Sequence, residues 1–195
     1  MLQYVVLIGV AINLAGSATY IRNTLRGRTK PNRVTYLMWG IAPLIATAAA
    51  TSKGVTWAAV PVFMSGFCPL MVLLSSFANR QAFWKLGKLD YVCGAFSVLA
   101  LILWVLTKQP TIAIILAIAS DGLAALPTLL KAWDHPETET GISYVFSVFG
   151  AATSFAAVRN WSFAECGFVI YLIILNVCLS LSVYSRQIRM RFARH

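Results

Sequence analysis

One acidic residue lies in the middle of a long apolar run. Asp121 occurs in the stretch "AIASDGLAALPTLL", which contains no Lys or Arg. Placing a charge in hydrocarbon costs about 3 kcal/mol or more, so such a residue normally faces a cavity or a partner. A carboxyl group that loads and releases a proton near the membrane midplane is what coupling to a proton gradient requires, and a cationic solute would use the same carboxylate differently. The alternative is that Asp121 only holds helices together.

Three further side chains are expected near the depth of Asp121. Asn13 lies 108 residues before Asp121, and Asn176 lies close to the middle of the last apolar run. Trp39 lies deeper in its run than the tryptophans expected at the membrane surfaces, and an indole can stack on a sugar ring or a flat heterocycle and donate one hydrogen bond. We take Asp121, Asn13, Asn176 and Trp39 as candidate substrate-binding residues. Ordinary packing is the alternative for Trp39.

Prolines and tyrosines provide candidates for a gate. Pro127 removes one backbone donor from its helix, and its ring pushes on the carbonyl group four residues earlier, so that the helix can bend there. Pro43 would act in the same way in the second run. Tyr36 and Tyr144, which lie 108 residues apart, could close one mouth of a pathway symmetrically. A static kink and a pair of interfacial tyrosines are the alternatives.

These residues require membrane helices to position them. Hydrophobic residues make up 59% of the 195-residue chain and charged residues only 11%, against roughly 25% charged residues in soluble domains. None of the apolar runs alternates as a barrel strand would. The sequence therefore predicts an all-α integral membrane protein, which we expect in a prokaryotic plasma membrane. The seven expected spans are residues 3–21, 34–52, 55–78, 90–107, 110–132, 142–158 and 161–185.

The basic residues predict an orientation. Thirteen of the sixteen Lys and Arg residues fall in the first, third and fifth loops and the C-terminal tail, and Lys53, Lys108 and Arg159 fall in the alternate loops. Loops rich in Lys and Arg stay in the cytoplasm. The N-terminus is therefore expected outside and the C-terminus in the cytoplasm, which requires an odd number of spans. Because the charge of +10 is divided among short loops, anionic lipid headgroups are the expected partner and nucleic acid is not.

The chain contains a weak internal repeat. "AINLAG" at 11–16 resembles "AIASDG" at 117–122, and "RVTYLMWG" at 33–40 resembles "GISYVFSV" at 141–148. Spans one to three thus correspond to spans five to seven. We expect one transmembrane domain over 1–195, with three-helix repeats at 1–81 and 110–187, a linker helix at 90–107 and a basic tail at 188–195. Because one helix separates the repeats, both enter the membrane in the same direction and are parallel. Chance similarity between apolar helices is the alternative.

The stretch "LPTLLKAWDHPETETGISY" carries a resemblance to a known family. Pro127 and Thr128, followed by Lys131, Glu139 and Tyr144, resemble the Pro-Gln or Pro-Thr motif and following turn of the SWEET, SemiSWEET and PQ-loop transporters. The three-plus-one-plus-three plan with an outside N-terminus is also theirs. The resemblance implies a transporter of mono- or disaccharides. The first half has Tyr20 and Ile21 where the proline dipeptide would fall.

We therefore expect a membrane transporter of a small polar solute that works by alternating access. The solute would be sugar-like, or a small cationic or heterocyclic metabolite, and transport would be proton-coupled if Asp121 titrates. A seven-helix receptor or cargo-binding protein with a one-sided pocket, a plan that the KDEL receptor also resembles, is the alternative. No enzyme activity, catalytic residue, metal site or cofactor is expected, since the residues at depth include one acid and no histidine. A homo-oligomer is compatible with the sequence.

Overall fold

The computed structural model describes residues 4–107 and 109–192, and this part of the chain is helical with no strand. Helices account for 84% of it. The elements are α1 (Val5–Leu25), α2 (Arg33–Ser52), η2 (Trp57–Ala59), α3 (Val60–Ala78), α4 (Lys88–Thr107), α5 (Pro110–Asp134), η3 (Pro136–Thr138), α6 (Gly141–Ala152), η4 (Thr153–Ala157) and α7 (Phe163–Phe192). The prediction of an all-α chain with seven helices is confirmed for the described residues.

Five of these segments are long and apolar enough to cross a bilayer, as expected of an integral membrane protein. They are Val5–Leu25, Arg33–Ser52, Trp57–Ala78, Pro110–Asp134 and Phe163–Ser185. The expected boundaries differ from those observed by a few residues. The largest difference is at the C-terminal end, where α7 continues through Phe192 into the segment expected as a tail. Residues 193–195 of that tail lie outside the described range.

Local chemistry explains several helix ends. Asn32 caps α2, because its side-chain oxygen accepts hydrogen bonds from the backbone N–H groups of Val34 (3.1 Å) and Thr35 (3.3 Å). Gly27 follows the end of α1 with a φ of +72°, a left-handed conformation that favours glycine. Pro110 begins α5, where its missing N–H group has no intrahelical acceptor to lose.

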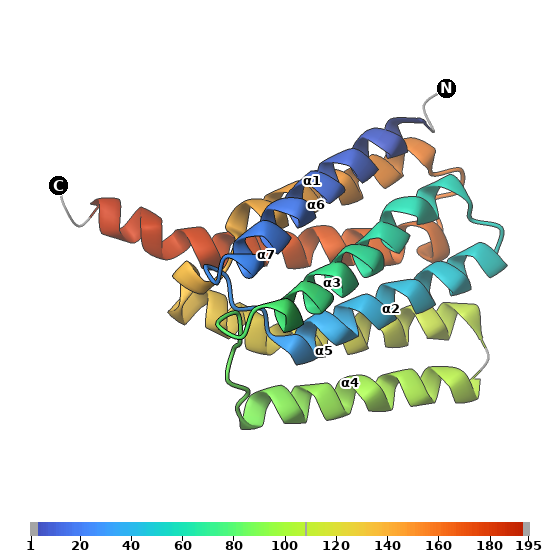
Figure 1. Cartoon of the computed structure of the whole chain (residues 1–195). Coiled ribbons are helices and arrows are strands. Elements are labelled where there is room, and N and C mark those ends of the chain that lie inside the picture. Colours follow the sequence, from blue (N-terminus) through green and yellow to red (C-terminus); the bar gives the residue numbers. More distant parts are fainter. Residues whose placement is uncertain (1–3, 108, 193–195) are drawn as a thin grey trace.

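The helices form a bundle with α4 on its outer edge (Figure 1). α1 packs on α3 and α6, α2 packs on α3 and α5, and α7 packs on α5 and α6. α4 contacts α5 and, less extensively, α2. We call α1, α2 and α3 the first helix group and α5, α6 and α7 the second. The two groups meet mainly where α1 packs on α6 and α2 packs on α5. The functional side chains lie between these two groups.

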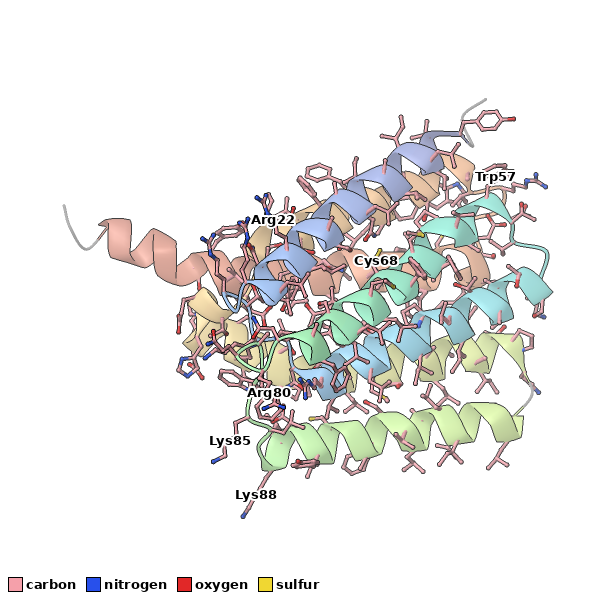
Figure 2. All side chains as sticks on the ribbon, in the orientation of Figure 1. Arg22, Trp57, Cys68, Arg80, Lys85 and Lys88 are labelled. Carbon is pink, nitrogen blue, oxygen red and sulfur yellow. The ribbon has the colours of Figure 1, made fainter. Side chains whose placement is uncertain are left out.

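The two ends of the bundle differ in charge. Figure 2 places Arg22, Arg80, Lys85 and Lys88 at one end, which we call the basic end, and Trp57 at the other. The connections α1–α2, α3–α4 and α5–α6 are at the basic end. The Asn79 side chain joins two of them by donating to the Leu25 carbonyl group (2.8 Å).

The outer surface of the bundle is apolar, and the contacts between helices use small residues. Leu74 is 61% exposed and Phe96 is 54% exposed, as expected for side chains that face lipid. Between α1 and α6, a Cβ atom added to Gly9 would lie only 2.8 Å from the Gly150 carbonyl oxygen. Only a very small residue permits this approach, which is the usual way in which membrane helices pack closely.

Candidate functional site

A cavity of about 60 Å³ lies inside the bundle, and the described residues of its wall come from α1, α2, α3, α5, α6 and α7. All four candidate substrate-binding residues, Asp121, Asn13, Asn176 and Trp39, line this one cavity. They come from α5, α1, α7 and α2 respectively. The space is enough for a few water molecules. The structure thus brings together side chains that are up to 163 residues apart in the sequence.

Two of the four candidate gate residues also line the cavity, and two do not. Tyr36 and Tyr144 form part of its wall, whereas Pro43 and Pro127 lie inside α2 and α5 without lining it. The prolines can therefore affect the cavity only through the shape of their helices. Pro69 in α3 does line the wall.

Asp121 is held by a single side chain. It is 1% exposed, and its Oδ2 atom accepts a hydrogen bond from the Tyr171 hydroxyl group of α7 at 2.7 Å. Its Oδ1 atom is buried and has no hydrogen-bond partner among the described residues. Asp121 lies near the middle of α5, far from both loops. Sequence reasoning missed Tyr171, because a tyrosine in an apolar helix has no feature that distinguishes it from a packing residue.

The two asparagines differ in how they are held. The Asn176 side chain donates one N–H to the Leu172 carbonyl group of its own helix (2.8 Å), so that its oxygen and its second N–H remain for another partner. Asn13 is 5% exposed and faces α6, where a Cβ atom on Gly150 would come within 3.2 Å of its side-chain nitrogen. A glycine at position 150 therefore gives the Asn13 amide the room that it occupies.

Trp39 lies at the junction of the cavity with an aromatic cluster. Its ring contacts those of Tyr36 and Tyr144 edge to face, with centroids 5.2 and 6.4 Å apart. The indole Nε1 atom is buried without a hydrogen-bond partner among the described residues. Buried indole N–H groups usually find an acceptor, so Trp39 offers an unsatisfied donor on a residue of the cavity wall.

Three tyrosines and one glutamate close the cavity toward the basic end. The Tyr20 and Tyr144 hydroxyl groups both donate to Glu139 Oε2, at 2.7 and 2.6 Å. The Tyr36 and Tyr144 hydroxyl oxygens are 3.4 Å apart, and the rings of Tyr20 and Tyr36 are 5.3 Å apart between centroids. The spacing of 108 residues thus pairs Tyr36 with Tyr144 across the two helix groups. We call Tyr20, Tyr36, Tyr144 and Glu139 with its ion pair the closing cluster.

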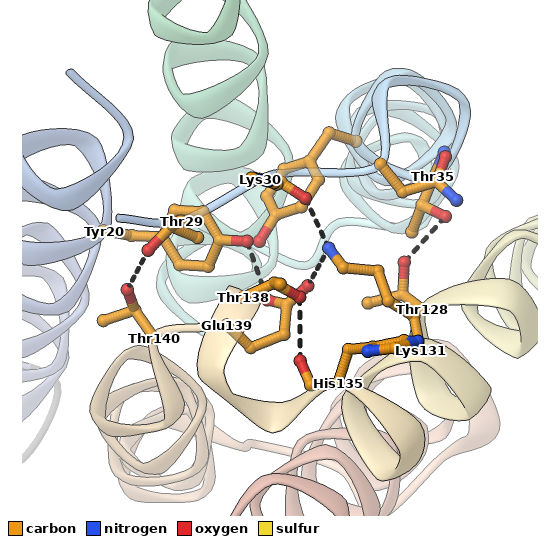
Figure 3. Close-up of polar contacts among 12 residues, drawn as sticks. Tyr20, Thr29, Lys30, Thr35, Thr128, Lys131, His135, Thr138, Glu139 and Thr140 are labelled. Carbon is orange, nitrogen blue, oxygen red and sulfur yellow. Dashed lines mark hydrogen bonds and ion pairs between the residues drawn. The ribbon is translucent and has the colours of Figure 1, made fainter. Parts of the chain in front are cut away.

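The closing cluster contains a buried ion pair. Lys131 Nζ lies 2.5 Å from Glu139 Oε1, and the two side chains are 1% and 0% exposed. Lys131 also donates to the backbone carbonyl group of Lys30, and its ammonium group lies 4.9 Å from the centroid of the Trp84 ring. Figure 3 shows Lys131 and Glu139 pointing toward each other. Glu139 therefore has a cation and two hydroxyl donors.

The loops on either side of the closing cluster are joined directly. The backbone N–H group of Lys30 donates to the Thr138 carbonyl group (3.0 Å), and the hydroxyl groups of Thr29 and Thr140 are 2.8 Å apart. Both contacts connect the α1–α2 loop with the α5–α6 connection (Figure 3). The basic end of the bundle is consequently held together by polar contacts in addition to helix packing.

A threonine pair joins α2 to α5 beside Pro127. The Thr35 hydroxyl group donates to the Ala124 carbonyl group of α5 (2.7 Å) and accepts a hydrogen bond from the Thr128 hydroxyl group (2.9 Å). A helix proline disturbs the backbone bonds of the preceding turn, so the Thr35 hydroxyl group supplies a donor where the helix itself is weakened. Any bend at Pro127 would have to change this contact.

No protein family model, curated protein or solved structure matches the chain in a comparison with each of these. The function must therefore be inferred from the geometry of the cavity and of its closing cluster.

Proposed function

We propose that the chain is a transporter that moves a small polar solute across the membrane by alternating access. The observation that carries this proposal is the single cavity that Asp121, Asn13, Asn176 and Trp39 share between the two helix groups. Solute sites of secondary transporters lie near the bilayer midplane at the interface of structural repeats. The wall of this cavity includes polar side chains whose burial costs free energy, which supports a binding role over simple packing.

The pattern of helix contacts supports the two parallel repeats. Exchanging α1, α2 and α3 for α5, α6 and α7 converts the α1–α3 and α2–α3 contacts into α5–α7 and α6–α7 contacts, all of which occur. The same exchange converts the α1–α6 contact into the α2–α5 contact. This symmetry is what a three-plus-one-plus-three duplication would produce, with α4 as the linker. It agrees with the proposed relationship to the SWEET and PQ-loop transporters.

We infer that the basic end faces the cytoplasm. Arg22, Arg80, Lys85 and Lys88 gather at that end (Figure 2), as the positive-inside rule requires. Helix α1 begins at the opposite end and α7 finishes at the basic end (Figure 1), which supports an outside N-terminus.

With that orientation, the closing cluster seals the cytoplasmic side of the cavity. Alternating access then requires the hydrogen bond from Tyr20 to Glu139 and the contact between Tyr36 and Tyr144 to break when the cavity opens to the cytoplasm. Because Tyr20 and Tyr36 belong to the first helix group and their partners do not, a separation of the two groups at the basic end breaks both. Bending at Pro127 or Pro43 would provide such a movement.

Transport is tested with the purified chain in proteoliposomes. Counterflow of labelled sugars, amines and amino acids identifies a solute. The proposal is supported if exchange of that solute is saturable, is lost in Trp39→Ala and is kept in the lipid-facing control Phe96→Ala. Saturable binding in detergent with no flux for any bound solute would instead indicate the receptor or cargo-binding alternative. Loss of exchange in both variants would contradict the assignment of the solute-binding site to the cavity.

A further inference from the structure

Among the described residues, the cavity wall contains one acidic side chain and no basic side chain to balance it when it is ionised. Asp121 is the single acid among the described residues of the wall, and none of those residues is Lys, Arg or His. Lys131, the cation of the closing cluster, forms an ion pair with Glu139. It is not one of the residues that line the cavity. An anionic or neutral solute would leave an ionised Asp121 without a counter-charge, whereas a cationic solute would supply one and favour the ionised carboxylate.

The atoms without partners indicate what the solute must offer. Asp121 Oδ1 requires a donor or a positive charge, since its other oxygen is already bound by Tyr171. Trp39 Nε1 is a donor and requires an acceptor. Both residues are at least nine-tenths buried, at 1% and 7% exposure. A ligand with a cationic group and an acceptor atom would satisfy both.

The wall between these two residues and the basic end is aromatic. Tyr20, Tyr36, Trp39 and Tyr144 all line the cavity, with neighbouring rings at centroid distances of 5.2 to 6.4 Å. Aromatic rings attract a cation that lies over their faces, and clustered rings recognise ammonium groups in this way. The uncharged polar side chains of the wall, which include Asn13 and Asn176, can bind the remaining polar atoms of a ligand.

We propose that the cavity is selective for a small organic cation that also carries a hydrogen-bond acceptor, with Asp121 as its counter-ion. This inference rests on the proposed function, because it names the class of solute that the transporter would carry. It also limits the size of the solute. A cavity of about 60 Å³ must widen to hold more than a few non-hydrogen atoms, so the ligand is small and its binding is coupled to movement of the helix groups.

The test is equilibrium binding to the full chain in detergent, measured by titration calorimetry and by the shift in melting temperature. The cationic probes are choline and ethanolamine, each of which carries a hydroxyl oxygen that can accept a hydrogen bond. The neutral probes are 3,3-dimethyl-1-butanol, which has the shape of choline without its charge, and glucose. We expect at least one cation to bind and choline to exceed dimethylbutanol by about tenfold or more in affinity, which corresponds to about 1.4 kcal/mol.

The variants assign the selectivity to one carboxylate. Asp121→Asn should lose about tenfold or more in cation affinity, while Asp121→Glu, which keeps the charge, should retain part of it. Size-exclusion profiles and melting temperatures of the unliganded variants establish that they are folded. Should Asp121→Asn not fold, the choline and dimethylbutanol comparison on the unchanged chain still decides the question.

The outcomes separate this inference from the proposed function. Any of three results would overturn the cation site. They are equal affinity for choline and dimethylbutanol, binding of glucose but of none of the cations, and unchanged cation affinity in Asp121→Asn. Proteoliposomes that exchange glucose would then leave transport intact. Cation binding without any exchange in proteoliposomes would preserve the cation site and overturn the transport proposal.

Discussion

Two buried carboxylates of this bundle have opposite surroundings. Glu139, in the closing cluster, accepts hydrogen bonds from Tyr20 and Tyr144 and forms an ion pair with Lys131. Asp121, in the cavity, accepts one hydrogen bond, from Tyr171, and its second oxygen has no partner among the described residues. Both are less than one-tenth exposed. The chain therefore satisfies one of these acids almost completely and leaves the other incomplete.

This difference indicates different roles. A buried charge whose partners all come from the same chain stabilises one arrangement of the helices, and losing a partner is costly. A buried charge with an incomplete set of partners is ready for a ligand or a proton. Glu139 is accordingly expected to control which side of the bundle is closed, and Asp121 is expected to control what binds. The following variants test that division.

The largest effect is expected from Glu139→Gln. The substitution leaves Lys131 as an uncompensated buried charge. Removing one partner of a buried ion pair typically lowers the free energy of unfolding by about 3–5 kcal/mol. SDS titration of the purified protein measures it. The double variant Glu139→Gln with Lys131→Met should recover a large part of the loss, because it removes the orphaned cation. A Glu139→Gln protein as stable as the parent would show that the closing cluster does not hold the bundle together.

Tyr144→Phe should have the next largest effect on stability. It removes a hydrogen bond of 2.6 Å to a charged acceptor, for which about 1.5–3 kcal/mol is typical. Tyr36→Phe is the matched control, since its hydroxyl group contacts only other tyrosines, Tyr144 at 3.4 Å and Tyr20, and its loss should cost less than about 1 kcal/mol. Equal losses in the two variants would mean that the hydrogen bond to Glu139 is not what distinguishes these tyrosines.

Thr35→Val examines the contact beside Pro127. The change removes the donor to the Ala124 carbonyl group and the acceptor of Thr128, and we expect a loss of about 1–2 kcal/mol. Thr47→Val is the control, because the Thr47 hydroxyl group donates only to the Pro43 carbonyl group of its own helix. If transport occurs, Thr35→Val should also change its rate by releasing α5 from α2. A rate and a stability equal to those of Thr47→Val would remove this contact from the gating scheme.

The sequence predicted the helices and the cavity wall better than it predicted the partners. Asp121 and Asn13 were identifiable because a polar residue in an apolar run has few structural uses, and Tyr36 and Tyr144 because the repeat aligned them. Tyr171 and Tyr20 were not identifiable, since the hydrogen bonds that define them join residues 50 and 119 positions apart. The Lys131–Glu139 pair was visible only as part of a loop motif. Its burial depends on how the α5–α6 connection packs against the α1–α2 loop.

The smallest change in stability is expected from Asp121→Asn, and this is the sharpest comparison with Glu139→Gln. An asparagine at position 121 keeps an oxygen that can accept the Tyr171 hydrogen bond, and it removes a charge that no cation of the chain balances. Burying a neutral amide costs less than burying an unpaired carboxylate, so the free energy of unfolding should change by less than about 1 kcal/mol or increase. The same SDS titration measures it. A loss as large as that of Glu139→Gln would mean that Asp121 is a structural contact, because a residue reserved for a ligand cannot be essential to the unliganded fold. A stable Asp121→Asn protein that no longer binds a cation would place stability and selectivity in separate carboxylates.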